Sequence, residues 1–204
     1  MSGEAWMSVW FYAHDLWLKV RSDLSLADRK KAAEVSKRYL GGQAMPRSEL
    51  PAAFYGVYRD KPVGHMNGFC FANGFFVVSE KAAGILEQFD LGEGGVHPVD
   101  IFEYDRTTPV EGRHFLLGLG AVKDAVLPGE SKEIHQPWQG HDIWWPESST
   151  RDDDIALGRQ ALQGPDLWCD SRFQNAFFLS GALVDALKKA RAGRIFDLRR
   201  CRVV

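Results

Sequence analysis

The sequence predicts an α+β protein: a mainly antiparallel sheet with two or more helices packed on one face, and an N-terminal strand–helix unit attached. Three observations predict this class. Two segments run from an apolar stretch through a serine into a helical pattern. Between them, residues 96–104 and 114–119 are strand-like and are separated by a turn. Residues 7–17 and 25–40 have the composition of one further strand and helix.

The two strand–serine–helix segments have the same residue types at the predicted start and end of their helices. Ser79 and Ser180 each follow a short apolar stretch, and serine is a favoured helix N-cap. Gly92 and Gly193 stand where the helices should stop. Two explanations stay open: related units flank a central sheet, or two ordinary amphipathic helices look alike by chance. The apolar positions are Ala82, Ala83, Ile85, Leu86 and Phe89 in one segment, and Leu183, Val184, Ala186, Leu187 and Ala190 in the other.

Further strands are predicted after the first of these helices. Residues 114–119 should return antiparallel to residues 96–104, and residues 121–127 are placed next to them. The remaining predicted elements are a short helix at 155–162 and strands at 166–170 and 194–203.

The N-terminal part predicts a strand, a helix and a long connection. Gly41 and Gly42 suit the end of a helix over residues 25–40, because glycine enters the left-handed conformation without a Cβ clash. Residues 45–73 hold three prolines and five aromatic residues and predict an irregular linker. We expect a single domain over residues 1–204, with an N-terminal subdomain over residues 1–50 as the alternative.

Composition limits the class of function. The chain has 204 residues, a formal net charge of −2 and 45% hydrophobic residues, as a globular protein does. General nucleic-acid binding needs a basic surface and is not expected. Cys70, Cys169 and Cys201 include no close pair, which argues against a disulfide framework or a zinc site. Residues 1–20 lack the features of a secretory signal, and no apolar run has the length of a membrane span. The sequence thus predicts a soluble cytoplasmic protein.

The histidines and glycines that could carry chemistry lack the spacing of known sites. His114, His135 and His141 match no metal-binding motif, and solvent-exposed loop histidines explain them better. Gly118 and Gly120 lack the third glycine and the following helix of a phosphate-binding loop. No nucleophile elbow or Walker lysine can be found. We therefore expect no catalytic residue, no metal and no cofactor.

The polar, turn-rich middle of the chain holds the candidate partner-binding residues. Trp138, Trp144 and Trp145 lie among turn residues, and tryptophan dominates interface hot spots. Of these, Trp144 and Trp145 are the candidate contact residues. Three consecutive acids, Asp152, Asp153 and Asp154, would add charge complementarity towards a basic partner. The alternatives stay open: the loop folds back and buries its tryptophans, and the acids form a solvated loop.

A series of short motifs extends from Phe76 to the last valines. The motifs are Phe76-Val77-Val78-Ser79-Glu80, Phe89-Asp90-Leu91-Gly92-Glu93-Gly94, His97-Pro98-Val99, Gly112-Arg113-His114-Phe115-Leu116-Leu117, Gly164-Pro165-Asp166-Leu167-Trp168, Phe177-Phe178-Leu179-Ser180 and Arg200-Cys201-Arg202-Val203-Val204. With these motifs, residues 75–204 resemble a family of bacterial immunity proteins from polymorphic toxin systems. That family was first described as a domain of unknown function and includes a myxobacterial immunity-protein domain. The N-terminal third matches it less clearly.

The resemblance implies that the chain binds and neutralises a cognate toxin effector. It assigns no catalytic residue and names no toxin activity. Because no secretory signal is expected, the toxin would be met in the cytoplasm. We expect steric occlusion by a non-enzymatic protein, with no membrane and no direct nucleic-acid partner, and the state of homo-oligomerisation is left open. The alternatives are an enzyme that reverses or removes the toxin's product, and a non-catalytic adaptor of a secretion system.

Overall fold

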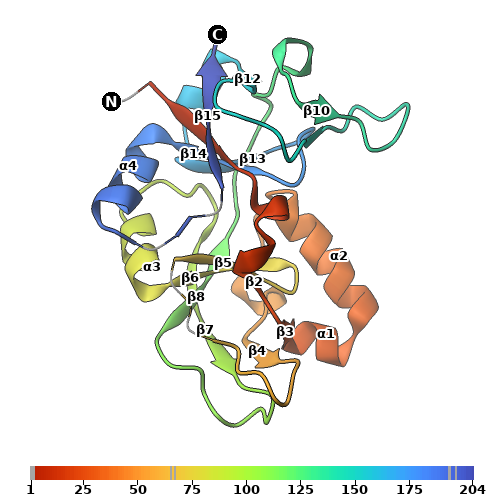
Figure 1. Ribbon diagram of the computed structural model, residues 1–204, viewed down its shortest axis with the longest axis vertical. Helices are drawn as coiled ribbons and strands as arrows, with labels where there is room; N and C mark the ends of the chain where they lie inside the picture. Colours follow the sequence, from red (N-terminus) through yellow and green to blue (C-terminus); the bar gives the residue numbers. More distant parts are fainter. Residues whose placement is uncertain (1–2, 65, 67, 193, 196) are drawn as a thin grey trace.

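Two mixed β-sheets, one above the other in Figure 1, organise the chain into an α+β fold. The computed structural model describes residues 3–64, 66, 68–192, 194–195 and 197–204. The upper sheet has six strands in the order β12-β15-β1-β14-β13-β9. Its strands are β1 (Ala5–Ser8), β9 (Val122–Lys123), β12 (Ala156–Leu157), β13 (Leu167–Asp170), β14 (Phe177–Ser180) and β15 (Leu198–Val203).

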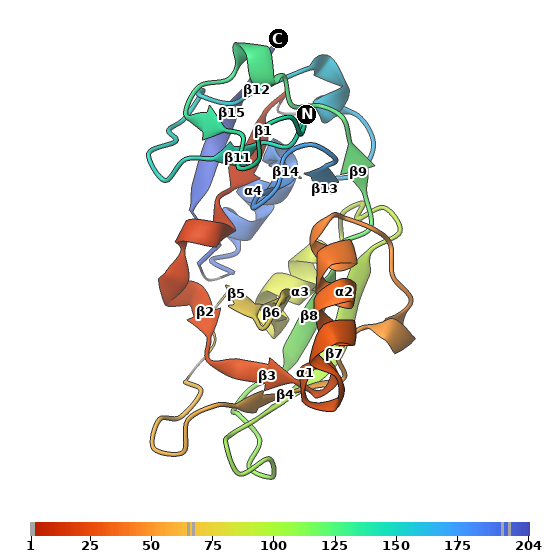
Figure 2. The ribbon, with the colours of Figure 1, turned by 90° about the vertical axis from the view of Figure 1, so that its right-hand side faces the viewer.

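The lower sheet has seven strands in the order β2-β5-β6-β8-β7-β4-β3. A separate two-stranded hairpin, β10 (Ile134–His135) with β11 (Trp145–Pro146), belongs to the upper half of the molecule (Figure 2). The strands of the lower sheet are β2 (Trp17–Leu18), β3 (Val20–Ser22), β4 (Ala53–Gly56), β5 (Phe69–Ala72), β6 (Phe75–Ser79), β7 (Gly95–Phe102) and β8 (His114–Gly118).

Two pairs of helices cover these sheets. Helices α1 (Asp23–Ala27) and α2 (Arg29–Leu40) pack on the lower sheet. Helices α3 (Glu80–Leu86) and α4 (Gly181–Lys189) contact each other where the two halves meet. Five short 3₁₀ turns complete the described elements: Trp10–Tyr12, His14–Leu16, Arg47–Glu49, Pro128–Glu130 and Arg159–Leu162.

Both predicted serine caps are confirmed. The Ser79 hydroxyl accepts a hydrogen bond from the Ala82 N–H at the start of α3, and the Ser180 hydroxyl accepts one from the Leu183 N–H at the start of α4. However, the two strand–serine–helix units belong to different sheets, so the prediction of one sheet carrying both helices on one face is wrong. Each helix packs on the sheet of its own preceding strand.

The predicted antiparallel arrangement holds for the centre of each sheet. Strands β7 and β8 form the expected antiparallel pair. Parallel pairs attach β12, β9 and β2 at sheet edges and join β4 to β7, so the sheets are mixed.

The placement of residues 121–127 beside β8 is wrong. The chain leaves the lower sheet after β8 and forms β9 beside β13 of the upper sheet. Gly120 lies so close to Gly94 that a Cβ at Gly120 would overlap the Gly94 backbone. The glycines at 118 and 120 thus permit a close backbone approach where the chain changes sheets.

The upper sheet separates two hydrophobic cores. Along β14, Phe177 and Leu179 belong to the larger core shared with the lower sheet, whereas Phe178 belongs to the smaller core on the other face. Alternate residues of a strand point to opposite faces, which explains this division. The polar stretch, predicted over residues 128–170, covers the smaller core with Ile155 and Leu157, next to Val126 from the segment before it. That stretch therefore supplies apolar cover as well as loops.

The N-terminal predictions need three corrections. The single strand over residues 7–17 is wrong: β1 ends at Ser8, and two 3₁₀ turns follow because the chain crosses here between the sheets. The predicted helix over residues 25–40 is split, since the Asp28 carboxylate caps the N–H groups of Lys30 and Lys31. The prediction of an irregular linker over residues 45–73 is wrong, because this segment contributes β4 and β5.

Two later predictions also need correction. The helix over residues 155–162 is wrong in its first part, where β12 pairs with β15, and only residues 159–162 form a 3₁₀ turn. The last strand begins at Leu198, not at residue 194. Helix α3 ends at Leu86, before Gly92, and Gly193 lies outside the described residues. Throughout the described part of the chain, no helix is both long and apolar enough to traverse a bilayer.

Candidate functional site

The β10–β11 hairpin presents an exposed tryptophan. Trp138, in the loop of this hairpin, leaves 51% of its surface exposed. Its ring meets the ring of Trp145 edge to face, with centroids 5.5 Å apart and planes at 82°. Edge-to-face contact is a favourable arrangement of aromatic rings, so each ring limits the freedom of the other.

Polar contacts hold the hairpin in place. His135 Nδ1 lies 2.6 Å from Glu147 Oε1 across the base of the hairpin. The Trp145 Nε1–H donates to Gln174 Oε1 at 3.3 Å, and the Tyr12 hydroxyl donates to the Pro146 carbonyl at 3.1 Å. The bonds to Gln174 and from Tyr12 tie the hairpin to segments far away in sequence, so the Trp145 ring is held in place by the protein itself.

The aromatic contacts continue from the hairpin onto the lower half of the molecule. The ring centroids of Phe11 and Trp145 are 5.9 Å apart, and those of His14 and Phe11 are 6.5 Å apart. The ring centroid of Trp17 is 4.7 Å from that of His14 and 5.1 Å from that of Phe71. We call this chain of rings the aromatic strip; its members are Trp138, Trp145, Phe11, His14, Trp17 and Phe71.

The aromatic strip combines exposed and half-buried rings. Trp138 and His14 are exposed, and the other four members are half-buried. The strip links the hairpin beside the six-stranded sheet to β2 and β5 of the seven-stranded sheet. It therefore offers a continuous set of rings across the junction of the two halves.

Trp144, the neighbour of Trp145, has a different environment. Its Nε1–H donates to Asp142 Oδ1 at 2.8 Å, and its backbone bridges to Phe173. Its ring packs against the smaller core. Trp144 thus fastens the loop to the upper sheet, while Trp145 belongs to the aromatic strip.

The three acids are bonded within the protein. Asp152 Oδ1 accepts the Arg200 backbone N–H at 2.8 Å, and Asp154 accepts the Arg151 N–H at 2.8 Å. The Arg200 guanidinium donates to both oxygens of Asp153 at 3.1 Å and 2.6 Å, and these bonds lower the pKa of Asp153 below its ordinary value. The acidic run therefore joins its loop to β15, although Asp152 and Asp153 remain exposed.

The structure does not bring the candidate histidines together. His114 is buried in β8 of the lower sheet. His135 pairs with Glu147 in the hairpin, and His141 is exposed in the hairpin loop. Over the described ranges, no group of three or more His, Cys, Asp or Glu residues has an arrangement that could hold a metal ion.

Most of the aromatic strip was missed from the sequence. Trp145 was among the predicted partner-binding residues, whereas Phe11, Trp17 and Phe71 were assigned to a strand and a linker. The available signal was the density of aromatic residues between Trp10 and Trp17. These residues follow β1, which ends at Ser8, so they serve another purpose than that strand.

A scan against protein families found no match, and a search of curated proteins found no relative.

Proposed function

We propose that this chain is an immunity protein that binds a cognate bacterial toxin in the cytoplasm and neutralises it by steric occlusion. The single observation that carries the proposal is the aromatic strip, with Trp138 half exposed at its end. The motif resemblance of residues 75–204 supports it by supplying the class of partner. The protein acts here as a binder and needs no catalytic residue.

The physical properties of the strip suit a protein partner. Tryptophan and tyrosine dominate binding hot spots because a large rigid ring buries much apolar area at little entropic cost. The Trp145 hydrogen bond to Gln174 and the edge-to-face contact of the Trp145 ring with the His135 ring, whose centroids are 6.0 Å apart, limit the motion of this ring before binding. Such preorganisation favours affinity, because less side-chain freedom is lost when the partner docks.

The residues predicted from sequence have different roles in this proposal. Trp145 stays in the contact surface, and Trp138 joins it. Asp152 is exposed and adds negative charge, which would steer a basic partner, whereas the Arg200 guanidinium balances the charge of Asp153. Trp144 and Asp154 do not belong to the contact surface. Trp144 packs against the smaller core, and Asp154 accepts a hydrogen bond from Arg151 within its own loop.

Co-expression with the toxin encoded by the neighbouring open reading frame tests the proposal. The protein should protect the cell and co-purify with the toxin at a fixed stoichiometry. Trp138→Ala combined with Trp145→Ala should weaken the toxin complex at least about 30-fold, as expected for loss of roughly 2 kcal/mol or more at a hot spot.

Tyr104→Ala is the matched control, because Tyr104 is a 50% exposed aromatic residue outside the aromatic strip. It should leave toxin affinity unchanged. Far-ultraviolet circular dichroism must show that each variant is folded. Protection without a detectable complex would contradict occlusion and favour an enzyme that removes the toxin's product. Equal affinity of the double variant and the wild type would remove the strip from the interface.

A further inference from the structure

The two edges of the seven-stranded sheet meet at one residue. Strand β2 forms one edge of this sheet and β3 forms the other, yet β2 ends at Leu18 and β3 begins at Val20. Only Lys19 separates them, so the sheet must curl until its edges are neighbours (Figure 2). The edges are not paired with each other in the sheet order, and a seam is left between them.

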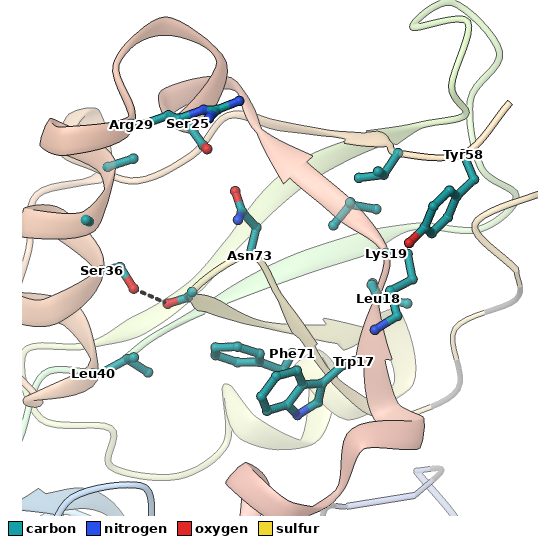
Figure 3. A pocket seen from close by; sticks show the side chains of 15 residues that line it. Trp17, Leu18, Lys19, Ser25, Arg29, Ser36, Leu40, Tyr58, Phe71 and Asn73 are labelled. Carbon is teal, nitrogen blue, oxygen red and sulfur yellow. Dashed lines mark hydrogen bonds between the residues drawn. The ribbon is translucent and has the colours of Figure 1, made fainter.

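A groove of about 550 Å³ lies at this seam. Helix α2 forms one wall, the β2–β3 segment forms the opposite wall, and the turn between β5 and β6 lies between them (Figure 3). This volume is in the usual range for small-molecule sites, roughly 300–1,000 Å³, and barrel mouths are a frequent location for them.

The walls of the groove are fixed by hydrogen bonds. The Ser36 hydroxyl on α2 donates to the Gly74 carbonyl at 3.1 Å, a bond drawn in Figure 3. A Cβ at Gly74, where φ is +99°, would overlap Ser36 Oγ, so glycine allows this close approach. On the other wall, the Val57 N–H donates to the Lys19 carbonyl at 3.0 Å. The protein's own hydrogen bonds therefore hold both walls of the groove.

Two aromatic rings supply an apolar surface at one end of the groove. Trp17 and Phe71 lie side by side there, with centroids 5.1 Å apart, and both are half-buried (Figure 3). The Trp17 Nε1–H donates to the Trp10 carbonyl at 3.2 Å, which fixes the orientation of the indole. These rings can stack on a planar group of a ligand.

The polar lining carries positive charge. Lys19 and Arg29 come from opposite walls, and neither forms an ion pair with any residue that the structure describes. Among the described residues, no Asp or Glu lines the groove. Asn73 Oδ1 accepts from the Ser22 N–H and hydroxyl at 2.9 and 3.1 Å, which leaves the Asn73 amide N–H groups for a ligand.

We propose that this groove binds a small anion that contains a planar aromatic ring, of the class of nucleoside monophosphates or aromatic carboxylates. The ring stacks on Trp17 and Phe71. The anionic group is bound between Lys19 and Arg29, and Asn73 donates to the polar part of the ligand. The two cations have no internal carboxylate to neutralise them, so an anionic ligand relieves an unbalanced local charge. This site shares Trp17 and Phe71 with the aromatic strip, but its test needs no toxin.

Titration calorimetry with the full chain tests the site. The probes are the four common ribonucleoside monophosphates, indole-3-acetate, ribose 5-phosphate and adenosine. At least one ring-containing anion should bind at one site per chain, and ribose 5-phosphate and adenosine should bind at least tenfold more weakly, because each lacks one recognised group. Binding only of nucleotides, or only of indole-3-acetate, identifies which of the two classes is correct.

Two double variants separate specific binding from general charge attraction. Lys19→Gln with Arg29→Gln should weaken the tightest probe at least tenfold. Lys30→Gln with Lys31→Gln removes the same charge from exposed positions of α2 that do not line the groove, and should leave binding within about twofold. The proposal is wrong if no ring-containing anion binds, or if both double variants weaken binding equally.

Discussion

Tyr39→Phe removes one oxygen atom from the centre of the protein. The Tyr39 side chain is completely buried, and its hydroxyl donates to the Leu117 carbonyl at 2.5 Å and accepts from the Phe76 N–H at 3.0 Å. Burial raises the pKa of Tyr39 well above its ordinary value, so the hydroxyl keeps its proton at neutral and mildly alkaline pH. The variant removes this partner from two buried backbone groups of different strands.

The expected loss of stability follows from these two groups. Depriving a buried donor or acceptor of its partner costs about 1–3 kcal/mol, so the two groups together should cost roughly 2–6 kcal/mol of unfolding free energy. Urea unfolding followed by both fluorescence and circular dichroism measures it, with an unchanged m value as the sign that only stability has changed. Tyr58→Phe is the control, since Tyr58 is 51% exposed and should change stability by less than about 0.5 kcal/mol. A Tyr39→Phe loss as small as that of the control would refute the reasoning.

The remaining predictions concern glycines, an ion pair and thiols. Gly74→Ala should lower the thermal midpoint because of its positive φ and its contact with α2, whereas Gly84→Ala, in open space within α3, should raise stability by roughly 0.5–1 kcal/mol. Arg200→Gln should raise the pKa of Asp153 towards 3.8 in an NMR titration. Because the pairing lowers the folded-state pKa of Asp153, its stabilising contribution is fully present above the unfolded pKa of 3.8 and is lost as pH falls through the lower folded-state pKa. The stability difference between variant and wild type should therefore begin to shrink near pH 3.8 and vanish below the folded-state pKa. A thiol reagent at pH 8 should label no cysteine in the native protein and all three in urea. The reason is that burial raises the pKa of the Cys70 thiol to about 11 and that of the Cys169 thiol to about 12, and it also raises the pKa of the Cys201 thiol.

Local chemistry made part of the fold predictable. An N-cap hydrogen bond joins residues three apart, so Ser79 and Ser180 could be recognised from their neighbours alone. The same holds for β7 and β8, whose turn and alternating pattern lie in one short stretch. The choice of sheet is different, because it depends on partners far away in sequence. For that reason the sequence suggested one sheet where the chain builds two.

The candidate site was less predictable than the fold for a related reason. The aromatic strip joins Phe11, Trp17, Phe71 and Trp145, which come from three distant parts of the chain. No spacing rule connects them, and only the folded chain places them side by side. The bond between Asp153 and Arg200 is equally non-local, so a run of acids that looked solvated is joined to the last strand.

The position of β1 has a consequence for synthesis on the ribosome. Strand β1 is synthesised before β14 and β15, but it lies between them in the sheet, with Ala5 opposite Ser180 on one side and Cys201 on the other. At about 5–20 residues per second, β1 waits roughly 10–40 seconds for these neighbours. During that time the apolar residues of β1 lack their native packing partners, and the core of the upper sheet cannot form. We expect nascent chains to need protection by a holding chaperone over this interval, and the protein to become active only after Val203 has emerged.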